Sequence, residues 1–150
     1  MTKLIDTPPA WLATCLIIAW LQSHYFDLGM SLDYGITDLL SAILLGGGII
    51  IFFMAVIQFR RHQTTIIPHQ EASNLITQGI YKWSRNPIYV ADTLILAGLI
   101  LRWDAVLSLP LIPIFVWIIE RRFVIPEENR LRRKFRADFA RYEKKTRRWV

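Results

Sequence analysis

The chain has 150 residues, enough for one domain, and 53% of them are hydrophobic, with a mean hydropathy of +0.32. This composition is too apolar for an ordinary soluble domain of the same length. Residues 120–150 hold 12 Lys and Arg against 5 Asp and Glu, whereas residues 1–119 carry a net charge of −1. An apolar body with a basic tail indicates a membrane protein whose tail lies against anionic lipid headgroups. A nucleic-acid partner is not expected, because acidic residues interrupt the basic tail.

The sequence lacks the usual metal-binding and nucleophilic signatures. Cys15 is the single cysteine, so an internal disulfide and a multi-cysteine metal site are excluded. The three histidines (His24, His62 and His69) have no partners at metal-ligand spacing, so no metal site is expected. No serine or cysteine nucleophile with a base beside it is visible.

Two long apolar runs come first along the chain. Residues 10–26 follow Pro8 and Pro9 and are just long enough to cross a hydrocarbon core of ~30 Å. Residues 39–59 form the second run, and the three consecutive glycines 46–48 at its centre allow close approach of another helix, a kink, or both; tight packing is the favoured interpretation. Both runs are predicted to be transmembrane helices.

Two shorter apolar runs follow, at residues 88–101 and 105–119. Because the turn between them is short, we predict a helical hairpin that crosses the membrane and returns, with its first helix extended back through Tyr89. Pro110 and Pro113 interrupt the second run, which neighbouring helices allow in membrane proteins. Asp92 interrupts the first run, and a carboxylate there is costly unless it faces the bundle interior or an aqueous cavity.

The distribution of charge predicts the orientation of these helices. The connection at residues 27–38 has three Asp and no Lys or Arg, whereas Lys and Arg occur in residues 60–87 and dominate the tail. The positive-inside rule then places residues 60–87, the tail and both termini in the cytoplasm. The predicted fold is all-α, a polytopic membrane protein with four transmembrane helices and a cytoplasmic amphipathic C-terminal helix.

The C-terminal helix is predicted to begin at Pro126, because Glu127 and Glu128 then lie at the positive end of its dipole. One face of this helix carries a carboxylate and then apolar and aromatic residues at steps of 3, 4, 4 and 3, namely Glu128, Leu131, Phe135, Phe139 and Tyr142. On periodicity alone, the favoured interpretation is an interfacial helix without a ligand site.

Residues 75–89 are unusually rich in polar and aromatic groups for a connection between membrane helices. They contain a glycine turn, two tyrosines, a tryptophan, an arginine and an Asn-Pro step. Each group has an ordinary explanation, such as an interfacial aromatic residue or an inside positive charge. Their combination predicts that residues 75–89 and 126–150 meet on one side of the membrane and form a single site.

These two stretches resemble the isoprenylcysteine carboxyl methyltransferase and phospholipid methyltransferase family of integral membrane enzymes. Residues 75–81 and 84–89 are similar to its Thr/Ser-x-Gly-Pro-Tyr turn and Arg-His-Pro-x-Tyr pattern. Residues 127–131, Phe135, Tyr142 and residues 147–149 are similar to its Glu-Glu-x-x-Leu…Phe-Gly-x-x-Tyr-x-x-Tyr…Arg ending. The resemblance covers residues 75–150, about half of the chain.

Four positions depart from the family's pattern. Ile80 stands in place of the proline, Asn86 of the histidine, Arg136 of the glycine, and Phe139 of the first tyrosine. Asparagine donates and accepts hydrogen bonds but does not exchange protons as histidine does. A working Asn86 is therefore expected to position other groups.

The resemblance implies transfer of a methyl group from S-adenosylmethionine to a lipophilic acceptor, with S-adenosylhomocysteine as product. Residues 1–150 would form one membrane-embedded domain whose cofactor pocket faces the cytoplasm and whose acceptor arrives from the bilayer. Such chemistry needs alignment and exclusion of water more than a nucleophile or a metal. The implied catalytic residues are Arg85, Asn86 and Glu128. The implied cofactor-binding residues are Tyr81, Arg85, Asn86, Pro87, Tyr89, Glu127, Glu128, Leu131, Tyr142 and Arg147.

The implied roles follow from charge. Arg85, with Arg147 or Arg148, would hold a carboxylate of the cofactor or the acceptor. Glu127 or Glu128 would take the cofactor's amino group or ribose hydroxyls, and the three tyrosines would line the pocket.

The residues do not decide the chemical class of the methyl acceptor. A carboxylate acceptor calls for an arginine and no base, whereas an amine must first lose a proton to a glutamate or to Asp92. Motif likeness favours carboxyl methylation, and N-methylation of a phospholipid or another lipophilic amine is the alternative. An alternative of another class is a non-catalytic membrane protein whose basic tail binds anionic lipid.

Overall fold

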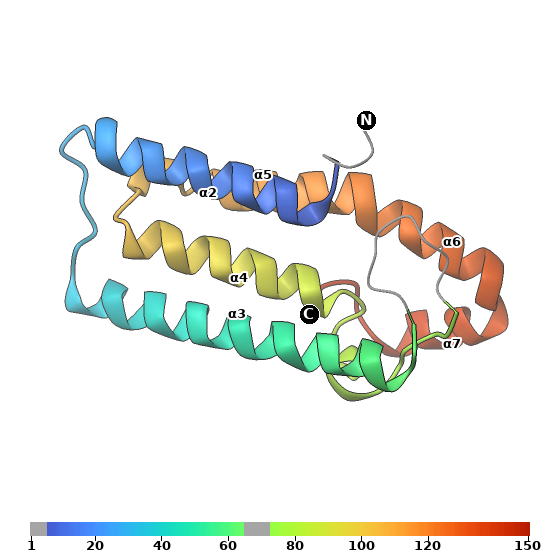
Figure 1. Ribbon diagram of the computed structural model, residues 1–150. Helices are drawn as coiled ribbons and strands as arrows, with labels where there is room; N and C mark the ends of the chain where they lie inside the picture. Colours follow the sequence, from blue (N-terminus) through green and yellow to red (C-terminus); the bar gives the residue numbers. More distant parts are fainter. Residues whose placement is uncertain (1–5, 65–72) are drawn as a thin grey trace.

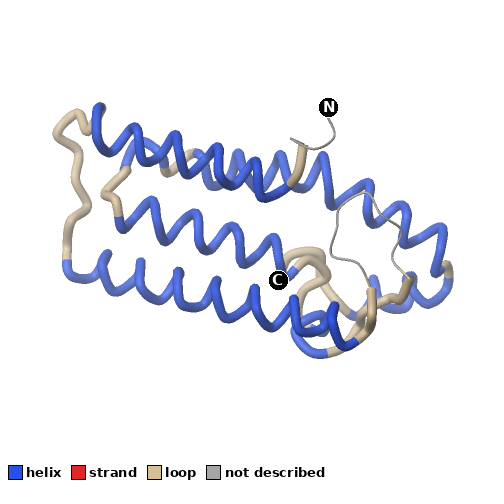
Figure 2. Tube along the Cα trace, in the orientation of Figure 1, coloured by secondary structure: helices blue, strands red, loops and turns tan. Residues whose placement is uncertain are grey.

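The computed structural model describes residues 6–64 and 73–150, and these residues form helices, turns and loops without a strand. The all-α prediction is therefore confirmed for the described part of the chain. Four helices lie lengthwise beside one another, as Figure 1 shows: α2 (Pro8–Tyr25), α3 (Gly35–Arg61), α4 (Pro87–Arg102) and α5 (Leu111–Ile119). At one end of this bundle, α6 (Ile125–Phe135) continues outward from α5, and α7 (Ala137–Lys145) returns toward the end of α3 (Figure 1 and Figure 2).

Among the described residues, α3 alone is long and apolar enough to cross a membrane by length and composition. It has 27 residues, and its most apolar window has a mean hydropathy of 2.6 with 17% of that window buried. Large apolar side chains also lie exposed along α2 and α3, among them Ile17, Ile18, Ile43, Ile50 and Phe53. An apolar surface of this kind fits contact with lipid. The predicted spans at residues 10–26, 88–101 and 105–119 correspond to shorter or less apolar helices, and their crossing stays a prediction.

Prolines mark where the helices begin. Pro8 and Pro87 occupy the first positions of α2 and α4, where a backbone N–H would lack a helical partner in any case. The helix α4 therefore includes Tyr89, as predicted. The predicted run 105–119 is not one helix, because Val106–Ser108 form the short 3-10 helix η2 and α5 begins at Leu111. Its two prolines lie at the start of α5, where they remove no helical hydrogen bond.

Two glycines bring α3 and α4 into close contact. A Cβ atom on Gly48 would lie 2.9 Å from Ile95 Cγ1 and 3.0 Å from the carbonyl oxygen of Ala91. A Cβ atom on Gly98 of α4 would lie 2.8 Å from Leu45 Cγ. Neighbouring glycines 46 and 47 have nothing within 4 Å of such an atom. The predicted tight packing is confirmed for Gly48, the one member of the triplet that faces α4.

The chain runs from α5 into α6 without leaving a helical path. Residues Glu120–Val124 form a π-helical turn, η3, between the two. Pro126 lies in the first turn of α6, where its ring would collide with the preceding turn of a regular α-helix. The wider π turn removes that collision. Pro126 thus lies at the predicted position, although it follows another helix directly.

The predicted single C-terminal helix is wrong, because the chain breaks at Arg136 and restarts as α7. Arg136 has φ +43° and ψ −109°, a conformation that only glycine adopts without strain. The apolar and aromatic residues predicted to share one face of that helix are called the stripe, and they nevertheless stay together. Phe139 and Tyr142 are buried in a cluster with Ala55, Ile76 and Tyr81, and the stripe residues Leu131 and Phe135 pack against the same cluster.

Candidate active site

The first polar stretch forms a tight turn followed by the start of α4. Gly79 opens the 3-10 helix η1 (Gly79–Lys82) with φ +61°, and a Cβ atom there would overlap the Gln58 side chain. The positive φ favours glycine at this position, and any larger residue would also displace the Gln58 side chain. Farther along, the Asn86 N–H donates to the hydroxyl of Ser84 at 3.0 Å, and Pro87 begins α4. This segment, residues 79–86, is called the motif turn from here on. It presents Tyr81, Arg85 and Asn86 at the end of the helix bundle.

The last residues of the chain, 142–150, are called the tail from here on. They return to this turn and are bound to it mainly through backbone carbonyl groups. The Arg85 N–H donates to the carbonyl oxygen of Arg147 at 3.0 Å, and the Asn86 amide donates to that of Arg148 at 3.0 Å. The Tyr142 hydroxyl donates to the carbonyl oxygen of Tyr81 at 2.7 Å. The two polar stretches therefore meet, as predicted from their composition. Asn86 makes the positioning contact that an asparagine can make.

A buried ionic cluster joins the same two stretches to α6. Glu128 is 4% exposed and receives Arg85 Nη2 at 3.0 Å on Oε1 and Arg148 Nη2 at 2.8 Å on Oε2. Arg85 also donates through Nη1 to the carbonyl oxygens of Glu143 and Thr146, at 3.2 and 2.8 Å. Arg85 is thereby neutralised by Glu128 and held by the tail.

The ionic cluster sets the charge of Glu128. Burial alone would raise the pKa of this carboxyl, but hydrogen bonds and charge from Arg148 and Arg85 outweigh it and hold the pKa below its ordinary value. Arg148 continues the chain of contacts, since its Nη1 lies 2.9 Å from Glu120 Oε1. The Trp149 indole N–H donates to the other Glu120 oxygen at 2.8 Å. The tail is thus fastened to both η3 and α6.

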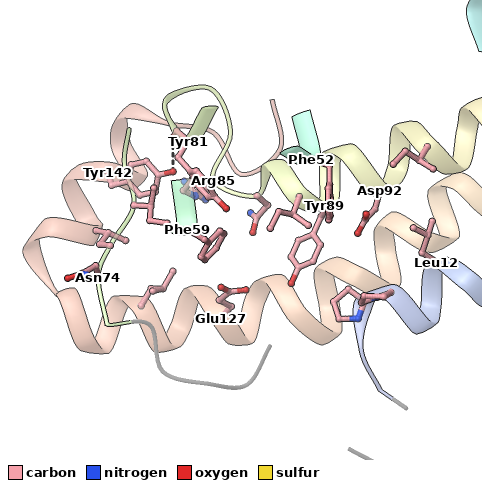
Figure 3. A pocket seen from close by; sticks show the side chains of 18 of the residues that line it. Leu12, Phe52, Phe59, Asn74, Tyr81, Arg85, Tyr89, Asp92, Glu127 and Tyr142 are labelled. Carbon is pink, nitrogen blue, oxygen red and sulfur yellow. Dashed lines mark hydrogen bonds between the residues drawn. The ribbon is translucent and has the colours of Figure 1, made fainter. Parts of the chain in front are cut away.

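A cavity of about 660 Å³ lies beside this cluster, between α2, α3, α4 and α6. Its volume falls within the range of about 300–1,000 Å³ usual for small-molecule sites. Figure 3 shows Tyr81, Arg85 and Tyr142 toward one end and Asp92 and Leu12 toward the other, with Glu127 and Tyr89 between them. Most of the remaining wall is apolar and includes Pro8, Pro9, Ala13, Leu16, Phe52, Phe59, Leu75, Ile76, Ile88, Ile95 and Leu131.

The predicted site residues divide between the cavity and the structure behind it. Those that line the cavity are Tyr81, Arg85, Asn86, Tyr89, Glu127, Leu131 and Tyr142. Glu128 is buried behind the wall in the ionic cluster, Pro87 begins α4, and the side chain of Arg147 is exposed. Of the two adjacent glutamates, Glu127 is therefore the one that faces the cavity.

Burial raises the pKa of the acid and hydroxyl groups of the wall that lie outside the predicted spans. Burial raises the pKa of Glu127, the nearby Glu128 charge adds to the effect, and Arg130 opposes it. None of the described residues forms a hydrogen bond or ion pair with Glu127. Burial likewise raises the pKa of the Tyr81 and Tyr142 hydroxyls, so both stay protonated donors. Within the described part of the chain, no group of three or more His, Cys, Asp and Glu side chains is placed to hold a metal ion, and His69 lies outside that part.

Several contributors to the site carried no signal in the sequence. The first turns of α2 supply a cavity wall, although residues 8–16 read only as the start of an apolar run. Glu120 and Trp149 fasten the tail: Glu120 lies outside both predicted site segments, and Trp149 lies in the second one without a predicted role. A buried partner for the Arg148 guanidinium could have been sought upstream, because the tail has more cations than acids.

Residues 36–138 match the family model of the phospholipid methyltransferases. No curated protein and no solved structure gives a match. The matched range is more than half of the chain and contains the motif turn, α4 and the Glu127–Glu128 pair. The family supports the resemblance noted in the sequence and, with the apolar α3, indicates association with a membrane. The chain therefore belongs to the phospholipid methyltransferase family.

Proposed function

We propose that the protein transfers a methyl group from S-adenosylmethionine to a lipophilic amine at the cytoplasmic face of a membrane. The observation that carries this proposal is the charge of the cavity. Two carboxyl side chains, Glu127 and Asp92, line it without an ion pair to any described residue, whereas its lining arginine, Arg85, is already paired with Glu128. Such a cavity suits cationic ligands.

The cavity residues fit S-adenosylmethionine. The volume is adequate, the rings of Tyr81, Tyr89 and Tyr142 offer faces for an adenine or a sulfonium, and Glu127 can accept a hydrogen bond from an amino group. When bound, this molecule supplies a methyl group on a positively charged sulfur; the bond from methyl carbon to acceptor forms as the carbon–sulfur bond breaks, and its electron pair stays on sulfur. The chain's own part is to align the partners and exclude water.

The state of Arg85 favours an amine acceptor over a carboxylate. A carboxylate would need a free guanidinium, but the Arg85 donors point to Glu128 and to two tail carbonyls. An amine needs a proton acceptor, and the cavity offers Asp92 and Glu127. The carboxylate that motif likeness favours is thus the less suited acceptor, and the family match to phospholipid methyltransferases agrees with an amine.

The site residues take two kinds of role in this proposal. Tyr81, Tyr89, Glu127 and Tyr142 contact ligands from the cavity wall. Arg85, Asn86 and Glu128 are positioning residues that hold the motif turn, the tail and α6 in register. Arg147 contributes through its backbone carbonyl.

The cytoplasmic orientation rests on the separation of charge along the bundle. Asp27, Asp33 and Asp38 lie at the end where α2 connects to α3, and the basic α6 and α7 lie at the opposite end (Figure 1). The positive-inside rule assigns the basic end, and with it the cavity's motif turn, to the cytoplasm.

Calorimetric titration of S-adenosylhomocysteine into the protein in lipid nanodiscs tests the cofactor site. We expect micromolar binding that weakens in Glu127→Gln and is unchanged in Arg133→Gln, a variant of an exposed residue of α6. Transfer of labelled methyl groups is then measured with phosphatidylethanolamine and with a prenylated cysteine. Labelling of the amine supports the proposal, and labelling of the carboxylate alone contradicts it. Absence of S-adenosylhomocysteine binding in lipid also contradicts it and would indicate that the basic residues 120–150 are the functional surface.

A further inference from the structure

Asp92 is a buried carboxylate with no hydrogen-bond or ion-pair partner in the described part of the chain. It lies in the second turn of α4, is 7% exposed, and no described residue donates a hydrogen bond or forms an ion pair with it. No side-chain oxygen in the described residues is both sealed from solvent and unpaired, so the Asp92 oxygens open onto the cavity that this residue lines. Figure 3 shows it toward the end that Leu12 borders.

This arrangement is costly for the fold alone. An ionised carboxyl in an apolar helix loses its hydration, and such groups are normally compensated by a partner or an aqueous cavity. By contrast, the adjacent Thr93 satisfies its hydroxyl on the carbonyl oxygen of Tyr89 at 2.8 Å. Within the described residues Asp92 therefore lacks a partner, which a ligand that enters the cavity can supply.

The surroundings of Asp92 indicate what that ligand is. The wall contributed by α2 and α3 is uncharged and mostly apolar: Pro8, Pro9, Leu12, Ala13, Leu16, Phe52 and Phe59. Among the described residues, the titratable groups of the cavity other than Asp92 are Arg85, Glu127 and the tyrosines Tyr81, Tyr89 and Tyr142. Arg85 is paired with Glu128, so no lining cation among the described residues neutralises Asp92. A cationic nitrogen on a lipophilic chain complements both the charge and the wall.

We propose that Asp92 is the acceptor-binding base of the cavity: it pairs with the ammonium of a lipophilic amine and takes its proton before methyl transfer. The inference rests on the proposed function and names the residue that selects its acceptor. In the proton step an N–H bond breaks, its electron pair stays on nitrogen, and the proton bonds to an Asp92 oxygen. The nitrogen lone pair is then free to attack, and the proton leaves through the cavity to solvent. Glu127, nearer the motif turn, is left for the cofactor.

The test compares Asp92→Asn and Asp92→Glu with the unaltered protein in nanodiscs that contain phosphatidylethanolamine. For Asp92→Asn we expect unchanged affinity for S-adenosylhomocysteine, a KM for the amine lipid raised about tenfold, and a kcat near neutral pH lowered about 10²-fold. Alkaline pH should restore part of the rate, because the amine then loses its proton to solvent. Asp92→Glu should retain more activity than Asp92→Asn. Asp38→Asn, which removes an exposed carboxylate at the far end of the bundle, serves as the control.

The outcomes separate this inference from the function on which it rests. Unchanged amine methylation in Asp92→Asn overturns the role of Asp92 and leaves the proposed function standing. Absence of S-adenosylhomocysteine binding by the unaltered protein overturns both. Asp92→Leu gives a further check, because removing an unpaired carboxylate should keep or raise Tm while activity is lost. A fall in Tm would show that Asp92 has a structural partner and contradict the inference.

Discussion

Arg148 lies across the carboxylate of Glu128, with Nε 3.2 Å from one oxygen and Nη2 2.8 Å from the other. This two-pronged contact fixes direction as well as distance. It fastens the tail to α6 at the point where Arg85 reaches the same carboxylate from the motif turn. One buried glutamate thus holds together three segments that the chain supplies separately.

Replacing Glu128 should therefore loosen the whole site. In Glu128→Gln two guanidinium groups lose their shared anion, and we expect a loss of about 3 kcal/mol in unfolding free energy, at the lower end for buried pairs because Arg148 is partly exposed. Denaturant unfolding in detergent measures it. Arg141→Gln breaks an exposed pair with Asp138 and should change stability by less than about 0.5 kcal/mol. Equal losses in the two variants would contradict the structural role of Glu128.

The same pair should make the protein sensitive to acid. The folded pKa of Glu128 lies below its ordinary value near 4.5, so its stabilisation is complete above that pH and is lost as pH falls through the lower folded pKa. We expect Tm to decline below about pH 4.5, and to decline less steeply in Glu128→Gln. Thermal unfolding between pH 7 and pH 3 gives the slopes, and parallel curves would count against this assignment.

Glu127 should behave in the opposite way. Burial raises its pKa, so the stability linked to Glu127 is complete below its ordinary pKa and is lost as pH rises through the folded pKa. We therefore expect Glu127→Gln to raise Tm at pH 7 and to have little effect below pH 4, measured by the same thermal unfolding. A lower Tm at pH 7 would mean that Glu127 has a partner that stabilises its charge.

The strained backbone at Arg136 offers a stabilising substitution. Glycine accepts the positive φ at this position, so Arg136→Gly should raise the unfolding free energy by about 1 kcal/mol. Arg133→Gly, inside the regular part of α6, should lower it by about 1 kcal/mol. Denaturant unfolding of both variants distinguishes relief of strain from a general effect of removing a charge, which would move both in the same direction.

The glycine contact between α3 and α4 can be tested with two neighbouring positions. In Gly48→Ala the new methyl meets Ile95 and the Ala91 carbonyl, and we expect a loss of about 1–3 kcal/mol. Gly46→Ala places its methyl in open space and should cost nothing. Unfolding of the two proteins in the same detergent is the measurement, and an equal cost at both positions would refute the packing explanation.

The sequence predicted most of the helices and the contact between the two polar stretches, because apolar runs, prolines and clustered polar residues are local signals. It could not assign the roles of Glu127 and Glu128. These neighbours have the same chemistry, and the returning path of Arg148 decides which one is paired. The break at Arg136 carried no local signal either, since arginine favours helix; the family's glycine at that position was the informative observation.

The shared contact of Arg85 and Arg148 with Glu128 also has a consequence for how the protein is made. The motif turn is made before α4, α5 and α6, but its arginine acquires its buried partners only after these helices have been made and residue 147 has returned to residue 85. Until then the cavity lacks one wall. Binding of the proposed cofactor therefore requires the completed C-terminal segment, and it can serve as a readout of completed synthesis.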